Sequence, residues 1–171
     1  MTTSITADGF GADQPAFLSK ERIIAKPGFN RWLVPPAALA IHLWLGHRFG
    51  VERGLWPAGG TPEALQALSW CTWSYVTYGA LVGRLHVATQ GEEVWRNTAQ
   101  AEAVMRQLNE LLEVLDARLV LQPWMLGADY SLVDLVVGSV LGYSVYLGAP
   151  VNAHPHVKDW LARVQARGHR S

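Results

Sequence analysis

Few side chains in this sequence have a type and spacing that could carry chemistry. Cys71 is the single cysteine, so the chain cannot form an internal disulfide. A reactive thiol needs electropositive, partly open surroundings, whereas Cys71 stands in an apolar helical stretch. We therefore expect a buried, inert thiol and a reducing compartment. No Ser-His-Asp order stands out either, and no residue is predicted to be catalytic.

His154 and His156 flank Pro155, and histidine is a common metal ligand. No cysteine or acidic residue stands beside them at a ligand spacing. The pattern favours a turn before a helix over a metal site, and we predict no bound metal.

The composition favours a folded domain. Hydrophobic residues make up 50% of the 171 residues and charged residues 16%, with fourteen basic residues balanced by fourteen acidic ones. A formal charge of zero argues against nucleic-acid binding, which needs an excess of Lys and Arg on one face. Residues 32–45 are apolar, but a run of about 14 residues is shorter than a membrane span and holds two prolines. We interpret it as a buried or interfacial helix.

Apolar residues recur with helical spacing along most of the chain, and no stretch alternates with period two. The sequence therefore predicts an all-α domain. The expected helices cover residues 37–49, 61–89, 94–121, 132–147 and 155–167. A connector rich in Gly and Pro separates the first two.

The strongest local signal precedes the helix at residues 132–147. Ser131 is placed to cap that helix by accepting the N–H of its third residue, and Asp134 can reach back to the N–H of Ser131. Tyr130 and Leu135 are spaced to form a hydrophobic staple across this capping box. The cap predicts where the helix begins.

Four sequence segments occur in order along the chain. The first is AIHLWLGHRFG at residues 40–50, before Leu55-Trp56-Pro57, and the second is ALSWCTW at 67–73. The third runs from Leu112 to Asp134 and contains the Gly127-x-x-Tyr130-Ser131-x-x-Asp134 cap, and the fourth is HPHVKDWLARV at 154–164. Together, residues 40–167 resemble the C-terminal all-helical domain of cytosolic glutathione transferases. The resemblance implies an irregular or partly disordered segment at residues 1–36, a helix and linker at 37–60, and the helical domain at 61–171.

The sequence departs from that family where glutathione chemistry would begin. The family's thioredoxin-like domain activates the thiol of glutathione, and an acidic-Ser pair grips the γ-glutamyl group. By register, that pair falls at Ala37 and Ala38, which can bind neither an amine nor a carboxylate. Residues 17–43 instead resemble the N-terminus of an oxalate/formate-type major-facilitator transporter. A truncated or chimeric chain is the simplest interpretation.

The resemblance implies a cytoplasmic protein in which one helix lines a site for a hydrophobic small molecule, with glutathione as the family's co-substrate. The residues of this apolar wall would be Trp70, Trp73, Thr77 and Tyr78, although aromatic residues on a central helix can equally be plain core. Two alternatives to an enzyme half stay open: a non-catalytic helical module that forms a homodimer or binds a thioredoxin-like partner domain, and a membrane-associated transporter fragment.

Overall fold

A computed structural model describes residues 34–168. The chain divides into two units, Met1–Arg31 and Trp32–Ser171, and the described residues all lie in the second. Every regular element among them is a helix, so the all-α prediction is confirmed. Most of the predicted N-terminal segment, residues 1–36, lies outside the described residues, as does the greater part of the transporter-like stretch.

The principal helices are α2 (Val34–Leu45), α3 (Pro62–Thr72), α4 (Gly79–Gln90), α5 (Thr98–Leu121), α6 (Leu132–Tyr146) and α7 (Pro155–Gly168). Short helical segments lie between them: η2 (Gly46–Gly50), η3 (Val51–Arg53), η4 (Trp73–Tyr78), η5 (Glu93–Trp95) and η6 (Val151–Ala153). No helix among these is long and apolar enough to cross a membrane.

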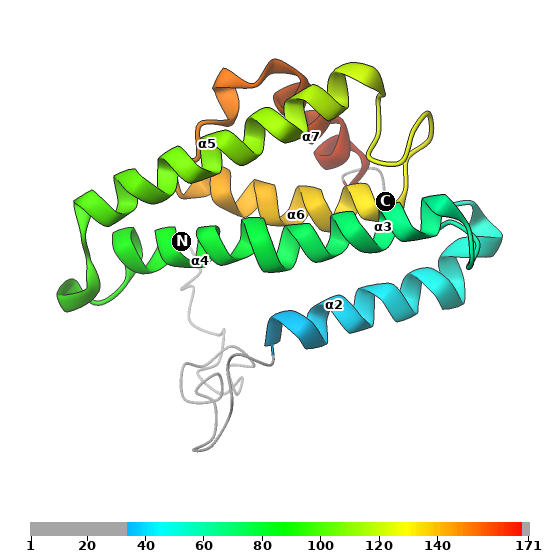
Figure 1. The fold of residues 1–171 in the computed structure, drawn as a ribbon, viewed down its shortest axis with the longest axis horizontal. Helices are drawn as coiled ribbons and strands as arrows, with labels where there is room; N and C mark the ends of the chain where they lie inside the picture. The colour runs from blue at the N-terminus through cyan, green and yellow to red at the C-terminus, as the bar shows by residue number, and fades with distance from the viewer. Residues whose placement is uncertain (1–33, 169–171) are drawn as a thin grey trace, which may run out of the picture. The chain divides into compact units, whose positions relative to one another are not determined.

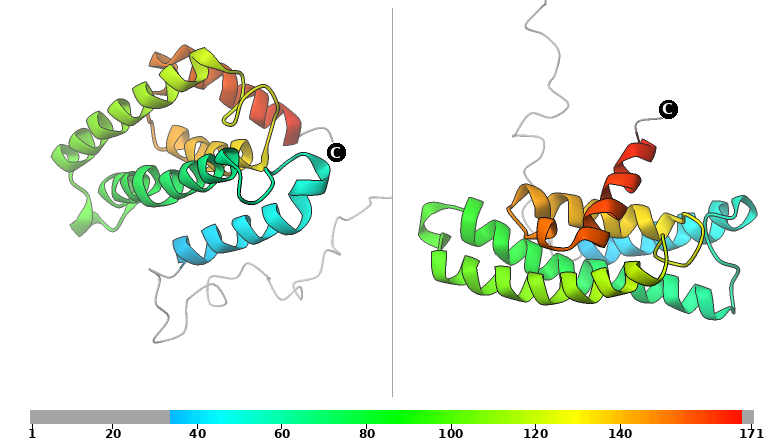
Figure 2. Two further views of the ribbon diagram at one scale, coloured as in Figure 1. Left: turned by 45° about the vertical axis from the view of Figure 1, so that its right-hand side comes forward. Right: turned by 90° about the horizontal axis from the view of Figure 1, so that it is seen from above.

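The elements α3, η4 and α4 join into one long rod (Figure 1). α5 runs back alongside the rod and α6 packs along it, while α7 contacts both α5 and α6. α2 packs on α3 and η4, on the side of the rod away from α5 (Figures 1 and 2). The buried side chains between rod, α5, α6 and α7 form one core, which includes Tyr78, Leu85, Leu108, Leu112, Met125, Val137, Leu141 and Trp160.

The sequence predicted one helix over residues 61–89, and η4 within the rod is a π-helix. Thr61 caps the start of the rod, because its hydroxyl oxygen accepts the N–H of Ala64 at 3.2 Å. The N–H of Gly79 then bonds to the carbonyl oxygen of Ser74, five residues back. A Cβ at Gly79 would lie 2.8 Å from that oxygen, so glycine allows the wider turn. Such π-bulges are frequent at functional sites.

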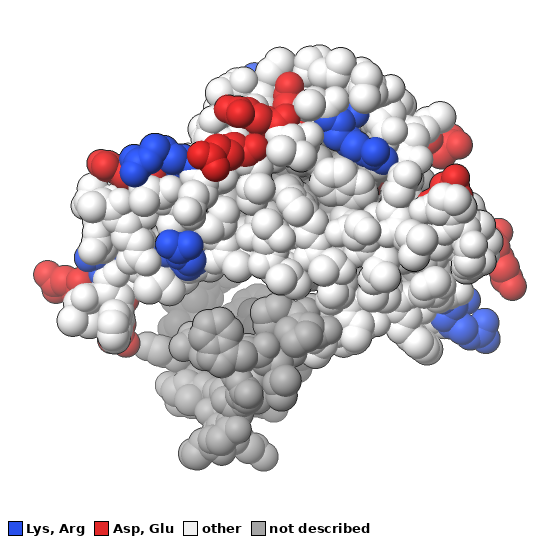
Figure 3. All heavy atoms as spheres, viewed as in Figure 1, with Lys and Arg blue, Asp and Glu red and all other residues white. Residues whose placement is uncertain are grey.

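α5 begins at Thr98, and the predicted start at Val94 was wrong. Asn97 caps the helix through its side-chain oxygen, which accepts the N–H of Gln100 at 3.0 Å. Val94 therefore stands in the preceding turn and is 77% exposed. Charged side chains gather over the outer side of α5, whereas much of the area over α3 carries none (Figure 3).

The predicted capping box at the start of α6 is present. Asp134 is fully buried, and its Oδ2 accepts the N–H of Ser131 at 2.9 Å and the Ser131 hydroxyl at 2.8 Å. Its Oδ1 accepts the N–H of Met125 and the indole Nε1–H of Trp160, each at 2.8 Å. One carboxylate thus joins the loop before α6 to α7.

The staple between Tyr130 and Leu135 stays a prediction. Leu135 is 47% exposed. The ring of Tyr130 meets Trp124 edge-on at 5.2 Å and lies 4.4 Å from the guanidinium of Arg167. Tyr130 therefore packs on the preceding loop and on α7.

α7 receives its N-terminal cap from a distant helix. The Oδ1 of Asp116, on α5, accepts the N–H groups of His156 and Val157 at 2.9 and 3.0 Å. The Nδ1 of His156 also lies 3.0 Å from Asp116 Oδ2. Partial burial alone would raise the pKa of Asp116, but the hydrogen bonds from the His156 ring and the Val157 N–H lower it below its ordinary value.

Asp116 should therefore make the stability of the fold depend on pH. A carboxyl with a lowered folded-state pKa stabilises the fold above its unfolded pKa, and this contribution is lost as the pH falls through the folded pKa. Asp116→Ala is expected to cost about 1 kcal/mol at pH 7, the usual value of a helix cap, and this difference should shrink from about pH 4 downward. Urea denaturation of both proteins across the acid range measures it. The exposed Asp129→Ala is the control, and an equal loss at pH 7 and pH 3 for Asp116→Ala would contradict the prediction.

Candidate functional site

The four residues of the predicted apolar wall do not share one surface. Trp70 and Trp73 meet edge-on at 5.4 Å, and the rings of Trp73 and Tyr78 lie 5.3 Å apart. These three residues form an aromatic row along the rod. Thr77 is exposed, whereas Tyr78 is fully buried. Only Trp70, Trp73 and Thr77 thus offer surface to a ligand, and their role in binding stays a prediction.

Tyr78 is fixed from α6. Its hydroxyl lies 2.8 Å from the hydroxyl of Ser144, which in turn donates to the carbonyl oxygen of Leu141 at 2.7 Å. Burial raises the pKa of Tyr78 to about 12, although the bond with Ser144 acts in the opposite direction. The phenol is therefore neutral at physiological pH, and it anchors the row to the core rather than acting as a base.

The other end of the row rests on Arg118 of α5. The guanidinium lies 5.5 Å from the centre of the Trp70 ring, and its Nη2 donates to Gln66 Oε1 at 3.1 Å and to the Met125 carbonyl oxygen at 2.8 Å. Its Nε is buried without a partner among the described residues. Arg118 thus ties the rod to α5 and to the loop before α6. Sequence periodicity did not single out Arg118, because an Arg on an amphipathic helix normally indicates a solvated face.

Cys71 is buried beside this row, as predicted. Burial raises the pKa of the thiol to about 12. Because the thiolate is the nucleophilic form, Cys71 is unreactive at neutral pH in this conformation.

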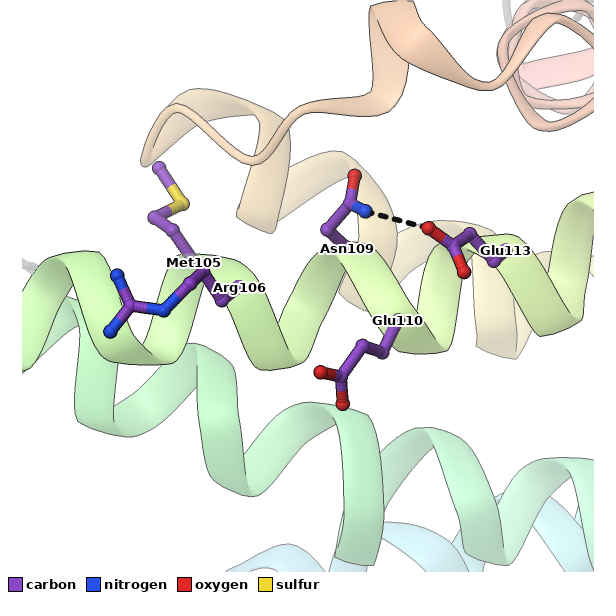
Figure 4. A pocket seen from close by; sticks show the side chains of 5 residues that line it. All are labelled: Met105, Arg106, Asn109, Glu110 and Glu113. Carbon is purple, nitrogen blue, oxygen red and sulfur yellow. Dashed lines mark hydrogen bonds between the residues drawn. The ribbon is translucent and has the colours of Figure 1, made fainter.

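A shallow hollow lies on α5, lined by Met105, Arg106, Asn109, Glu110 and Glu113. In Figure 4 the side chains of Met105 and Asn109 point toward the segment between α6 and α7. Asn109 donates to Glu113 Oε1 at 2.9 Å, and His154 Nε2 lies 3.0 Å from Asn109 Oδ1. His154 therefore fastens that segment to α5, and no cluster of metal-ligating side chains occurs within residues 34–168.

The architecture defines a class: a helical bundle domain with a central rod, a capped core helix and a terminal helix that closes the core. The family model for the glutathione S-transferase C-terminal domain matches residues 78–167, just over half of the chain. The chain belongs to the glutathione S-transferase family through this domain.

Solved structures agree with that assignment. A glutathione transferase from Methylococcus capsulatus str. Bath is 26% identical with a TM-score of 0.66, and the match covers 75% of this chain and 60% of that one. The theta-class enzyme from Xanthomonas axonopodis pv. citri with glutathione bound is 25% identical with a TM-score of 0.62, over 78% and 66% of the two chains.

A Phanerochaete chrysosporium glutathione transferase in complex with oxidized glutathione has the same fold at 20% identity and a TM-score of 0.66, over 75% of this chain and 60% of that one. The chain thus spans about 60% of the length of such relatives. No match was found among curated protein sequences.

Proposed function

We propose that this chain is the hydrophobic-substrate half of a glutathione-conjugating enzyme and is inactive by itself. The family match over the helical half supports it. In a complete enzyme, the glutathione thiolate would attack an electrophilic carbon held against the apolar wall, and the leaving group would depart. Ala37 and Ala38 of α2 stand where the family's acidic-Ser pair is expected, and neither methyl group can bind the γ-glutamyl group. A cytoplasmic location fits this proposal.

Glutathione binding and conjugation test the proposal directly. A ligand that binds the folded state raises the melting temperature by mass action. We expect millimolar glutathione to leave the melting temperature of the full chain unchanged. We also expect no conjugation of 1-chloro-2,4-dinitrobenzene above the rate without protein. A saturable rise in melting temperature together with catalysed conjugation would show that the chain is an enzyme on its own.

The apolar-wall part of the proposal has a separate test. 1-Chloro-2,4-dinitrobenzene alone should quench tryptophan fluorescence saturably, and Trp73→Ala should weaken that binding several-fold because an aromatic contact is lost. Trp95→Ala is the matched control, because Trp95 is exposed in the turn before α5 and lies outside the aromatic row. If both substitutions weaken the binding of 1-chloro-2,4-dinitrobenzene equally, the proposal that Trp73 belongs to a ligand-binding apolar wall is rejected.

We also propose that two copies of the chain associate through the front apolar face, which we define as Leu65 and Val76 on the rod with Val114 and Leu121 on α5. All four side chains are more than half exposed. The two helices are neighbours here, as the Arg118–Gln66 hydrogen bond shows. Large exposed apolar patches mark association sites, and the sparse charge over α3 in Figure 3 fits a buried interface.

Val114→Glu should dissociate the dimer, because the interface would then bury an unpaired carboxylate. Sedimentation equilibrium measures the dissociation constant, which we expect to rise at least about tenfold. Val94→Glu, in an exposed turn away from this face, should leave it unchanged. A wild-type protein that remains monomeric at high concentration would contradict the proposed dimer.

A further inference from the structure

One face of α2 is apolar and exposed. The helix packs on α3 and η4 through its partly buried side chains (Figures 1 and 2). On the opposite face stand Ile41, Trp44 and Leu45, and all three side chains are exposed. Phe49 of η2 is exposed as well, and its ring meets Trp44 edge-on at 5.7 Å. We call these four residues the outer face of α2.

An exposed cation lies at the end of the outer face of α2. The guanidinium of Arg48, in η2, lies 5.4 Å from the centre of the Phe49 ring. Within residues 34–168, no carboxylate pairs with Arg48. A tryptophan and an arginine at the end of an apolar stripe are typical of helices at a membrane–water interface. There the indole lies at the level of the headgroups, and the long Arg side chain reaches the lipid phosphates.

The charges of the chain are distributed unevenly around α2. Residues 15–53 hold six of the fourteen basic residues but only two of the fourteen acidic ones, and residues 34–51 hold no acidic residue. Residues 54–171 hold eight basic and ten acidic residues. The formal neutrality of the whole chain therefore conceals an excess of positive charge close to the apolar helix in sequence. Four of the six basic residues precede the described part of the chain: Lys20, Arg22, Lys26 and Arg31.

A negatively charged membrane surface matches both properties. Helices that lie at such a surface bind through buried apolar area together with attraction to anionic lipids, and each nearby basic residue strengthens that attraction. A protein partner would also cover the apolar side chains. The cores of protein interfaces are depleted of charged residues, however, so a protein partner gives the excess of positive charge no role.

We propose that the outer face of α2 binds the surface of an anionic lipid bilayer. The helix lies in the plane of the interface, with its exposed apolar side chains among the upper parts of the acyl chains and Arg48 at the lipid phosphates. The helical bundle stays in water on the other side of α2. This surface is separate from the front apolar face, and membrane binding does not depend on glutathione conjugation.

Co-sedimentation of the full chain with lipid vesicles tests the proposal. The probe is a phosphatidylcholine vesicle that contains about one third phosphatidylserine. We expect saturable binding to these vesicles, and binding at least about tenfold weaker to vesicles of phosphatidylcholine alone. High salt should weaken binding to the anionic vesicles, because it screens the attraction between the basic residues and the lipid.

Trp44→Glu places a carboxylate in the outer face of α2 and should weaken binding to the anionic vesicles at least about tenfold. Trp95→Glu is the matched control, because it changes the net charge by the same amount. Trp95 is 63% exposed and Trp44 60%, but Trp95 lies in the turn before α5. We expect the control to bind within about twofold of the wild type.

Trp44→Phe supplies a second measurement that does not depend on the folding of the charged variant. Phenylalanine keeps an aromatic ring in the outer face, so Trp44→Phe should still sediment with the anionic vesicles. Quenching of the tryptophan fluorescence by lipids with brominated acyl chains should fall, because Trp44 is the indole that enters the bilayer.

Three results would overturn the membrane surface: a wild-type chain that stays in the supernatant with the phosphatidylserine vesicles, equal vesicle binding by Trp44→Glu and Trp95→Glu, or equal quenching in Trp44→Phe and the wild type. Sedimentation equilibrium without vesicles gives a fourth. Self-association that persists in Val114→Glu but is lost in Trp44→Glu would assign the outer face of α2 to a second copy of the chain instead.

Discussion

Replacing Asp134 with Ala is expected to lower the free energy of unfolding by about 4 kcal/mol, because it leaves several buried donors without an acceptor. The carboxylate accepts from the Ser131 backbone and hydroxyl, the Met125 backbone and the Trp160 indole. Each unpaired buried donor costs about 1–3 kcal/mol, but the four losses share one relaxing site and do not add fully. Urea denaturation monitored by circular dichroism gives the difference.

Two further substitutions distinguish the loss of the carboxylate's hydrogen bonds from the loss of side-chain volume at position 134. Asp134→Asn keeps the shape but turns an NH₂ group toward donors, so it should cost at least about 2 kcal/mol. Ser139→Ala should be nearly neutral, because the exposed Ser139 hydroxyl bonds only to the carbonyl of Val136 within α6. A loss below about 1 kcal/mol in Asp134→Ala would show that the network contributes little.

Gly46→Ala is the second substitution for which we expect a large effect on the free energy of unfolding. A Cβ at Gly46 would lie 2.5 Å from Cδ2 of the Trp56 ring, which is itself buried. Overpacking costs about 1–3 kcal/mol, and a contact this short with a buried ring belongs to the upper part of that range, about 2–3 kcal/mol. This exceeds the ~1 kcal/mol that Ala gains over Gly in a helix. We expect a net loss of about 1–2 kcal/mol in thermal or urea unfolding.

Gly83 supplies the opposite case within the same protein. A Cβ at Gly83 meets nothing within 4 Å, so Gly83→Ala should stabilise the fold by about 0.5–1 kcal/mol. The clash at Gly46 also predicts coupling: in a Trp56→Leu background, Gly46→Ala should lose most of its cost. If Gly46→Ala is as costly without the tryptophan ring as with it, the close packing is not the cause.

Periodicity and capping predicted most of the fold. The apolar spacing located α5, α6 and α7 to within a few residues, because amphipathic helices and their caps are local signals. Asp134 was recognised as the N-terminal partner of Ser131. Its bonds to Met125 and Trp160 were not, because they join residues that only the tertiary fold brings together.

The misplaced start of α5 has a local physical cause. The apolar Val94 extended the predicted α5, although Asn97 is the better cap. The contacts of the Tyr130 ring with Trp124 and Arg167 were not predicted, because Arg167 comes close to Tyr130 only in the tertiary fold.

The candidate site was predicted less well than the fold. One helix was predicted over residues 61–89, and the π-helical turn within it changes which side chains face α2. Trp70, Trp73 and Tyr78 do form a row, but Tyr78 is closed within the core. The contact between the Tyr75 hydroxyl and His42 Nδ1 was not predicted, because 33 residues separate the two side chains in sequence.

The remote cap of α7 bears on how the domain assembles. Asp116 and His156, in the first turn of α7, are 40 residues apart in sequence. Trp160 of α7 and its partner Asp134 are 26 residues apart. An isolated helix of 14 residues is marginally stable in water. We therefore expect α7 to be stable only when Asp116 of α5 and Asp134 of α6 are in position to bond to it. The amide hydrogens in the middle of α7 should therefore exchange with solvent mainly through opening events shared with those elements, so we expect α7 to unfold together with the rest of the core.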